Sequence, residues 1–102
     1  MLGLARRAGR VSMGHDMAMK SLKSKKARLL IFSSDISPRL IEEFNRAVSR
    51  YSNDIVCLRI DETIHDIHKA LGYKAGVLTV DDKDFAKRIN ELINQEGNVY
   101  GN

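Results

Sequence analysis

The run Leu29-Leu30-Ile31-Phe32, between Arg28 and Ser33, decides the fold class of this chain. Successive side chains of a strand point to opposite faces, so four large apolar residues in a row require that both faces be covered. Two further short β-rich runs follow, at 55–60 and 76–80. The sequence therefore predicts a small sheet with helices packed against both of its sides.

The segment that follows this run has the apolar spacing of a helix with one buried face. Its apolar residues recur at intervals of three and four positions from Leu40 to Tyr51. Ser37 is placed to cap the helix, and Pro38 suits the first helical position, where its missing N–H is not needed. We therefore expect a helix that begins at Pro38.

Two more helices are predicted in the second half of the chain. Residues 61–71 have apolar side chains spaced for one face, and Gly72 is placed to end this helix in a left-handed conformation. Residues 82–94 follow the same pattern, and the aspartates at their start are favourable near the positive end of the helix dipole. Strand 76–80 separates the two helices.

The amino-terminal segment predicts a short helix. We expect this helix within residues 2–10, and we expect it to end at Gly9. Leu4 and Ala8 are expected to face inward, with the arginines of the segment turned outward.

A brief edge strand, 11–13, and a second helix, 16–24, follow. Between them Gly14 allows a turn with positive φ and leaves the first N–H groups of the helix free to meet a phosphate or a base edge. Asp16 and Lys20 lie one helical turn apart on the same face, where a simple surface ion pair is the alternative interpretation.

The elements then alternate as helix, strand, helix, strand, helix, strand, helix, strand, helix. This order favours an α/β/α sandwich around a small mixed or parallel sheet of about four strands. A length of 102 residues fits one domain, residues 1–102, with a polar tail at 97–102 that is expected to fray.

Positive charge is concentrated at the amino end. The first 28 residues hold eight of the seventeen Lys and Arg against one acid, whereas the other 74 residues carry a net charge of −3. Such a distribution favours a polyphosphate partner, because each neutralised phosphate releases counterions. Nucleic acid is the expected partner, and a solvated basic face that keeps the protein soluble is the alternative.

Composition excludes several classes of protein. The longest apolar run is too short to cross a bilayer, and no secretory signal is recognisable, so a cytosolic protein that does not bind membranes is expected. The single Cys57 is expected to be a small buried hydrophobe. With no exposed apolar stripe predicted, we expect a monomer.

No pattern for catalysis or cofactor binding is found. His65 and His68 have a spacing that can hold a metal ion, but no third ligand is recognisable, and phosphate-binding and nucleophile motifs are missing. Ser33 to Asp35 follow a strand, where open α/β sheets often bind ligands, so a small ligand-binding or hydrolytic domain stays open as an alternative. We expect no enzyme, no cofactor and no metal.

Several short motifs together carry a resemblance to a known family. They are the opening Leu-Gly-Leu-Ala-Arg-Arg-Ala-Gly-Arg, residues 14–20, Ser34-Asp35 with Pro38, Ala70-Leu71-Gly72 and residues 85–88. In order and spacing they resemble the L7Ae/L30e ribosomal-protein family, and most closely its small bacterial YlxQ group. The resemblance covers essentially the whole chain.

The resemblance implies an L30e-like α/β/α domain that binds kink-turn RNA, a sharply bent helix with tandem sheared G·A pairs. The partner would be structured RNA, such as a kink-turn or ribosomal RNA, with the ribosome as a further candidate partner. The residues that the resemblance and the charge pattern assign to RNA binding are Arg6, Arg7, Arg10, Gly14, His15, Asp16, Met17, Lys20, Lys23, Ser37, Ile41, Tyr73, Lys74, Ala75 and Gly76.

Two positions depart from the family pattern. Asp16 replaces an amide, which removes an N–H donor, and Met17 replaces a glutamate that accepts hydrogen bonds from guanine. RNA binding could then persist with broader specificity, because phosphate contacts position a protein without reading sequence. A protein-interaction subunit that docks on a ribosomal or transcription complex through the same basic face, without reading RNA itself, is the remaining alternative.

Overall fold

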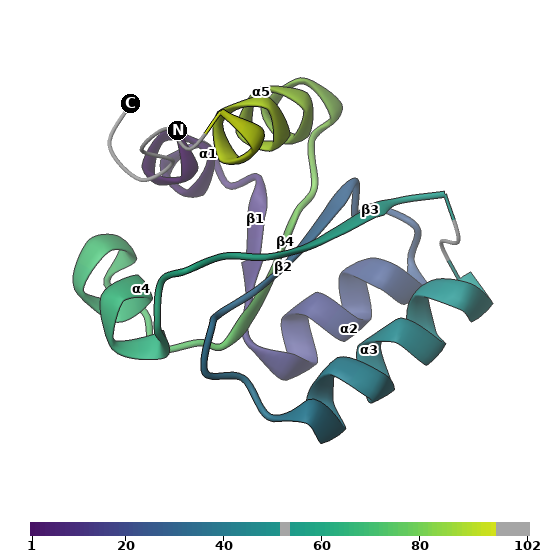
Figure 1. Cartoon of the computed structure of the whole chain (residues 1–102). Helices are drawn as coiled ribbons and strands as arrows, with labels where there is room; N and C mark the ends of the chain where they lie inside the picture. Colours follow the sequence, from purple (N-terminus) through teal and green to yellow (C-terminus); the bar gives the residue numbers. More distant parts are fainter. Residues whose placement is uncertain (52–53, 96–102) are drawn as a thin grey trace.

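A computed structural model describes residues 1–51 and 54–95, and it places five helices and four strands in them (Figure 1). In chain order these are α1 (Leu2–Arg7), β1 (Val11–Met13), α2 (His15–Lys23), β2 (Leu29–Phe32), α3 (Pro38–Tyr51), β3 (Val56–Arg59), α4 (Ile64–Leu71), β4 (Val77–Val80) and α5 (Lys83–Asn94). The predicted alternation of helix and strand is confirmed. The tail that was expected to fray, 97–102, lies outside the described residues.

The four strands form one mixed sheet in the order β1-β4-β2-β3. β2 and β3 are parallel, with Leu29 opposite Val56. β4 is antiparallel to both of its neighbours, so that Val80 lies opposite Val11 on one side and opposite Leu29 on the other. The last strand is thus inserted between the first and the second, and the two central strands are buried at every position.

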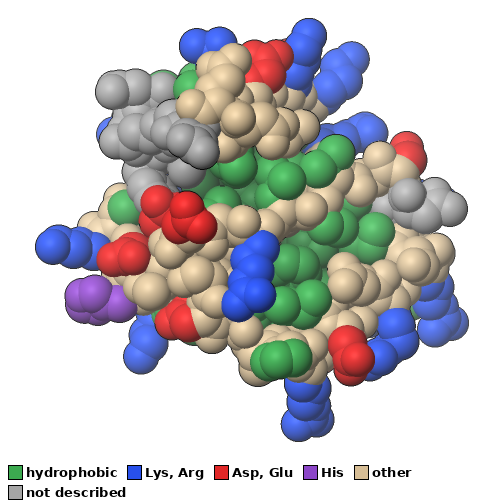
Figure 2. Space-filling view, viewed as in Figure 1, with side chains coloured by type: hydrophobic (Ala, Val, Ile, Leu, Met, Phe, Trp, Pro, Cys, Tyr) green, Lys and Arg blue, Asp and Glu red, His purple; other side chains and the backbone are tan. Residues whose placement is uncertain are grey.

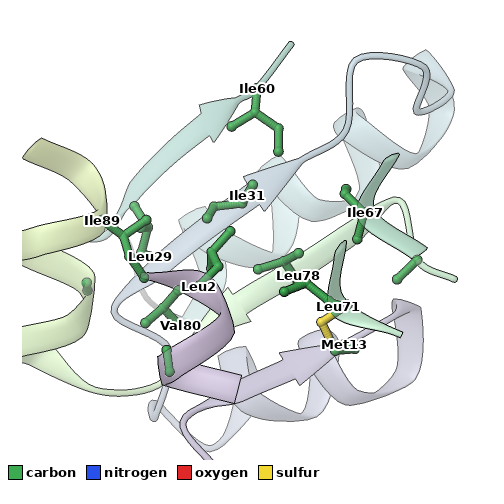
Figure 3. Close-up of a cluster of buried hydrophobic side chains, with 13 residues drawn as sticks. Leu2, Met13, Leu29, Ile31, Ile60, Ile67, Leu71, Leu78, Val80 and Ile89 are labelled. Carbon is green, nitrogen blue, oxygen red and sulfur yellow. The ribbon is translucent and has the colours of Figure 1, made fainter. Parts of the chain in front are cut away.

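Helices cover both faces of the sheet, which confirms the predicted three-layer α/β/α sandwich. On one face α1, α4 and α5 pack on a cluster that includes Leu29 and Ile31 (Figure 3). On the other face α2 and α3 enclose a second cluster that includes Leu30 and Phe32. Side chains of β2 therefore alternate between the two clusters, as the apolar run predicts.

The fourth and fifth helices begin slightly later than predicted. α4 starts at Ile64 because Thr63 and Asp66 form a capping box in front of it. It ends at Gly72, whose φ of 77° confirms the predicted left-handed cap. Asp82 precedes α5 and accepts a hydrogen bond from the N–H of the third residue after it.

The inward face predicted for the first helix is wrong. α1 ends at Arg7, and its buried residues are Leu2 and Ala5. Leu4 is 42% exposed, and Ala8 is an exposed cap residue beyond the helix. A helix of six residues has room for one short contact stripe, and the stripe that meets α4 and α5 is formed by Leu2 and Ala5.

The burial predicted for Cys57 is also wrong, because β3 is the edge strand next to β2 and little covers it. Val56 is 44% exposed, and apolar side chains appear on the surface between α5 and α3, where β3 runs (Figure 2). Neighbouring atoms still desolvate the Cys57 sulfur enough to raise the pKa of its thiol. The monomer expected from the sequence stays a prediction.

Candidate nucleic-acid interface

Three loops lie together at one end of the molecule, the lower end in Figure 1: the β1–α2 turn, the β2–α3 loop and the α4–β4 loop. Two backbone hydrogen bonds join them. The Gly14 N–H donates to the Val77 carbonyl at 2.9 Å, and the Ser33 N–H donates to the Gly76 carbonyl at 2.9 Å. The start of β4 therefore holds the other two loops in place. We call this surface the loop cluster and define it as residues 14–17, 33–37 and 72–76.

Gly14 makes the turn that opens α2. Its φ of 89° lies in a region that residues with side chains rarely adopt. A Cβ atom at this position would meet the Tyr73 ring at 3.6 Å, an ordinary contact, so the backbone angle selects glycine here. No side chain caps the start of α2. The N–H groups of its first turn can therefore donate to an anion or to a base edge.

His15 links the start of α2 to α3. Its Nε2 lies 2.7 Å from Glu43 Oε2, its Nδ1 lies 3.1 Å from Asp16 Oδ1, and its ring meets the Phe44 ring edge-on at 5.4 Å between centres. The hydrogen bond to Glu43, followed by the one to Asp16, raises the pKa of His15. The protonated form of His15 thus offsets part of the negative charge of two carboxylates that would otherwise oppose a polyanion.

Arg6 and Tyr73 form a second contact within this region. Arg6 Nε donates to the Leu71 carbonyl at 2.9 Å, and its guanidinium carbon lies 5.7 Å from the centre of the Tyr73 ring. Tyr73 is 47% exposed. The arginine therefore holds the ring from α1, and it is itself half-buried.

The other residues of the α4–β4 loop differ in whether they are exposed or packed inside the protein. Lys74 is exposed, whereas Ala75 is buried in the cluster beneath α4. Gly76 is tightly packed: a Cβ atom there would lie 3.1 Å from Ile64 Cδ1 and 3.3 Å from Ser33 Oγ. Only the first two of the four residues predicted in this loop thus present side chains to a partner.

The two residues predicted at the start of α3 have structural contacts of their own. Ser37 Oγ accepts a hydrogen bond from the Leu40 N–H at 3.3 Å, and α3 begins at Pro38, as predicted. Ile41 is half-buried and packs against the second core cluster, which also contains Ala18 of α2. Ile41 therefore supports the angle between α2 and α3.

The remaining predicted residues of α2 lie along its exposed side. Met17 is 52% exposed, and Lys20 and Lys23 are exposed. Two shallow hollows flank the helix. One, of about 590 Å³, is bordered by His15 and Lys23, and the other, of about 600 Å³, lies between α2 and β1. We call the second hollow the β1 groove, and Lys20 borders both.

The other two predicted arginines lie apart from the loop cluster. Arg10 borders the β1 groove, and its carbonyl accepts a hydrogen bond from the Asp81 N–H at 2.7 Å. Arg7 is exposed near Met1, where burial and the charge of Arg7 lower the pKa of the amino group. Within residues 1–51 and 54–95, no hydrogen bond or ion pair joins the Arg7 side chain to the loop cluster.

Sequence reasoning missed Glu43 and Asp81. Glu43 is one of many charged residues on the polar side of α3, and only the packing of α2 on α3 brings it to His15. Asp81 directly precedes the N-cap of α5, so the sequence indicated only that it lies near a helix start. In the structure its carboxylate accepts hydrogen bonds from three hydroxyl groups. No spacing in the sequence indicates either contact.

The alternative sites have a different character. Asp35 Oδ1 accepts a hydrogen bond from the Ile64 N–H at 2.9 Å, which lowers the pKa of Asp35 and makes it a cap of α4. His65 and His68 are exposed, and the described part of the chain holds no group of three side chains able to ligate a metal ion.

None of the helices in the described residues combines the length and the apolar character that a bilayer crossing needs.

A sequence model of the Ribosomal protein L7Ae/L30e/S12e/Gadd45 family matches residues 1–89. The chain belongs to this family. The match runs from α1 into α5, so it includes all three segments of the loop cluster as well as the β1 groove. The resemblance identified from the sequence motifs is confirmed.

Known proteins resemble this L7Ae-family chain in sequence or in fold. It is 26% identical over 93 residues to the RNA-binding protein YlxQ of Enterococcus faecium, covering 91% of this chain and 87% of that protein. A solved structure of a protein of unknown function from Bacillus halodurans matches with a TM-score of 0.81 at 24% identity, covering 91% and 92% of the two chains. A 15.5kD RNA binding protein from Giardia lamblia matches with a TM-score of 0.70 at 15% identity, covering 92% and 79%.

Proposed function

We propose that this chain is a non-catalytic RNA-binding protein that holds a bent, kink-turn-like RNA at the loop cluster. Family membership and the printed names of YlxQ and of the Giardia protein support RNA as the partner. The observation that carries the proposal is that the uncapped start of α2 lies beside an exposed aromatic ring. A Cβ atom added at Gly14 would lie 3.6 Å from the Tyr73 ring.

Each part of this juxtaposition suits a different part of an RNA. The N–H groups at the start of α2 can donate to phosphate or base acceptors. Tyr73 offers a surface on which an unpaired base can stack. Lys20 lies one helical turn beyond Asp16 on α2, and it can neutralise a phosphate. A bent RNA with a flipped-out base presents all three features close together.

Asp16 gives the interface its chemical preference. Its carboxylate is fully exposed and accepts hydrogen bonds without donating any. Exocyclic amino groups such as guanine N2–H are donors of matching character. We propose that Asp16 takes the place of the family's amide by accepting from such a group, while His15 holds the Asp16 side chain through its Nδ1.

The wider setting is proposed from the same features. The chain would act as one domain, residues 1–102, as a monomer in the cytoplasm, and within a ribonucleoprotein or the ribosome. Ala75 and Gly76 would contribute by fixing the α4–β4 loop, and Ser37 and Ile41 by fixing the start of α3.

A titration with a kink-turn RNA and a straight duplex, each at low and moderate salt, tests the proposed function. We expect tighter binding of the kink-turn, affinity that falls steeply with salt, and a larger loss from Lys20→Ala than from Lys87→Ala on α5. Equal losses from the two substitutions would contradict the proposal. Binding of a protein partner that survives nuclease treatment, with no RNA affinity, would favour the docking alternative.

A further inference from the structure

The β1 groove gathers basic side chains, of which only Lys20 takes part in the contact proposed at the loop cluster. Five of them border it, against one acid, Asp81. Within the described residues none of the five forms an ion pair, since the recorded pairs involve His15 and Arg88. The five are Arg10, Lys20, Lys25, Lys26 and Arg28.

The inner side of the groove offers few free hydrogen-bond donors. Asp81 accepts hydrogen bonds from the hydroxyls of Ser12, Ser21 and Thr79 at 2.5, 2.6 and 2.7 Å. Ser24, also on the groove, donates to the Lys20 carbonyl at 2.9 Å. Because these hydroxyl groups have partners within the protein, the groove presents mainly the charge of exposed Lys and Arg side chains, which suits phosphate.

The backbone at Lys25 gives an independent indication. α2 ends in a Schellman motif, in which the Lys25 N–H donates to the Leu22 carbonyl at 3.1 Å and the Lys26 N–H donates to the Ser21 carbonyl at 3.0 Å. Lys25 has a φ of 60°, and it is the only residue other than glycine with positive φ in the described chain. Glycine is the favoured residue at this position of the motif.

α1 ends in the same motif and shows the usual choice. Gly9, with a φ of 73°, donates to the Arg6 carbonyl at 3.0 Å, and Arg10 donates to the Ala5 carbonyl at 2.9 Å. Gly9 and Lys25 border the same groove. The motif that ends α1 thus has glycine at this position, whereas the motif that ends α2 has a lysine in an unfavourable conformation. That lysine adds positive charge to the groove.

We infer that the β1 groove is a second RNA contact, for the phosphodiester backbone of a double-helical stem that adjoins the segment held at the loop cluster. The inference rests on the proposed function, since one RNA would have to reach both sites. α2 connects them, and a helix of nine residues is about 13 Å long. Lys20, near the middle of α2, borders the groove and would mark the passage from one site to the other.

The test uses one kink-turn RNA in three forms: with a short flanking stem, with a long one, and with a single-stranded extension of equal length in place of the long stem. The protein variants are a groove triple, Lys25→Gly/Lys26→Ala/Arg28→Ala, and a matched control on α5, Lys83→Ala/Lys87→Ala/Arg88→Ala. Affinity is measured over a range of salt concentrations by fluorescence anisotropy.

We expect the wild type to bind the long-stem RNA several-fold more tightly than the other two forms. The groove triple should lose this gain, keep its affinity for the short-stem RNA, and lower the salt slope for the long-stem RNA by about two to three. The control triple should keep the gain. Equal behaviour of the two triples, or an equal gain from the single-stranded extension, would overturn the inference.

The single variant Lys25→Gly separates binding from folding. Glycine relieves the unfavourable φ, so the melting temperature should rise, while affinity for the long-stem RNA falls. A lower melting temperature, or unchanged affinity, would contradict the role given to Lys25. If the wild type bound none of the RNAs, the proposed function would fail. If it bound all three equally, only the groove contact would fail.

Discussion

The guanidinium carbon of Arg6 lies 5.7 Å from the centre of the Tyr73 ring, while Arg6 Nε donates a hydrogen bond to the Leu71 carbonyl. One residue of α1 thus fastens both the end of α4 and the aromatic ring that follows it. Arg6, which the charge pattern assigned to RNA binding, thus also contacts an exposed aromatic side chain on which a base could stack.

Arg6→Ala should weaken RNA binding through Tyr73. We expect a loss of about 1 kcal/mol in the free energy of unfolding, from the lost cation–π contact and hydrogen bond, measured by urea denaturation. Tyr73→Ala alone should weaken RNA binding by about 1–3 kcal/mol, and Arg6→Ala should add little to it. Arg7→Ala removes the same charge from the neighbouring position and serves as the control. An equal effect of Arg7→Ala on binding would show that Arg6 acts through charge alone.

Gly14→Ala should disturb the loop cluster through its backbone. The φ of 89° disfavours any residue with a Cβ, so the free energy of unfolding should fall by about 1–2 kcal/mol. Gly9→Ala has a similar φ of 73° and no neighbour within 4 Å of the added methyl, so it should lose similar stability. With a kink-turn RNA that has a short stem, only Gly14→Ala should reduce affinity. Equal affinities of the two variants would count against the start of α2 as a contact.

His15 should titrate above its ordinary pKa of 6.5, because Glu43 and Asp16 stabilise the protonated ring. The folded protein then binds this proton more tightly than the unfolded chain does. The resulting stability is fully present below about pH 6.5 and is lost as the pH rises through the folded-state pKa. NMR titration of His15 measures this value directly.

Glu43→Gln should return the pKa of His15 toward 6.5, since Glu43 is the largest cause of the shift. Glu42→Gln changes the adjacent, exposed carboxylate and should leave the His15 titration nearly unchanged. A His15 pKa at or below 6.5 in the wild type would contradict the contact between α2 and α3.

Asp81→Ala should destabilise the fold strongly. It leaves the hydroxyls of Ser21 and Thr79, both buried, without their acceptor, and each such group costs about 1–3 kcal/mol. We expect a loss of at least about 2 kcal/mol in the free energy of unfolding, measured by urea denaturation. Asp84→Ala, which removes an exposed carboxylate in the first turn of α5, should lose less than about 1 kcal/mol. Similar losses from the two would mean that the hydroxyl contacts contribute little.

Local pattern predicted the fold well because each element carried its own evidence. The run Leu29–Phe32 required cover on both faces, Pro38 marked a helix start, and Gly72 marked a helix end. Exposure of Cys57 could not be predicted in the same way. Whether a strand is central or at the edge depends on the order of pairing, and β4 takes the central place that a strand earlier in the chain could have occupied.

The candidate site was predictable only in part, for a related reason. Gly14 and Tyr73 stand in recognisable motifs, so the sequence could assign them to one surface. The pairing of His15 with Glu43, and of Ser12 and Ser21 with Asp81, joins residues 28 to 69 positions apart. Such contacts follow from the packing of helices and strands, which periodicity along the chain does not specify.

The hydrogen bond from the Gly14 N–H to the Val77 carbonyl also sets an order of events during synthesis. β1 leaves the ribosome before β4, the strand with which it pairs, and three other strands and helices are made between them in addition to α2 and α4. Until residue 77 is out of the exit tunnel, the β1–α2 turn lacks this hydrogen bond. A chain that stops before residue 77 should therefore bind RNA at the loop cluster more weakly than a chain that includes β4.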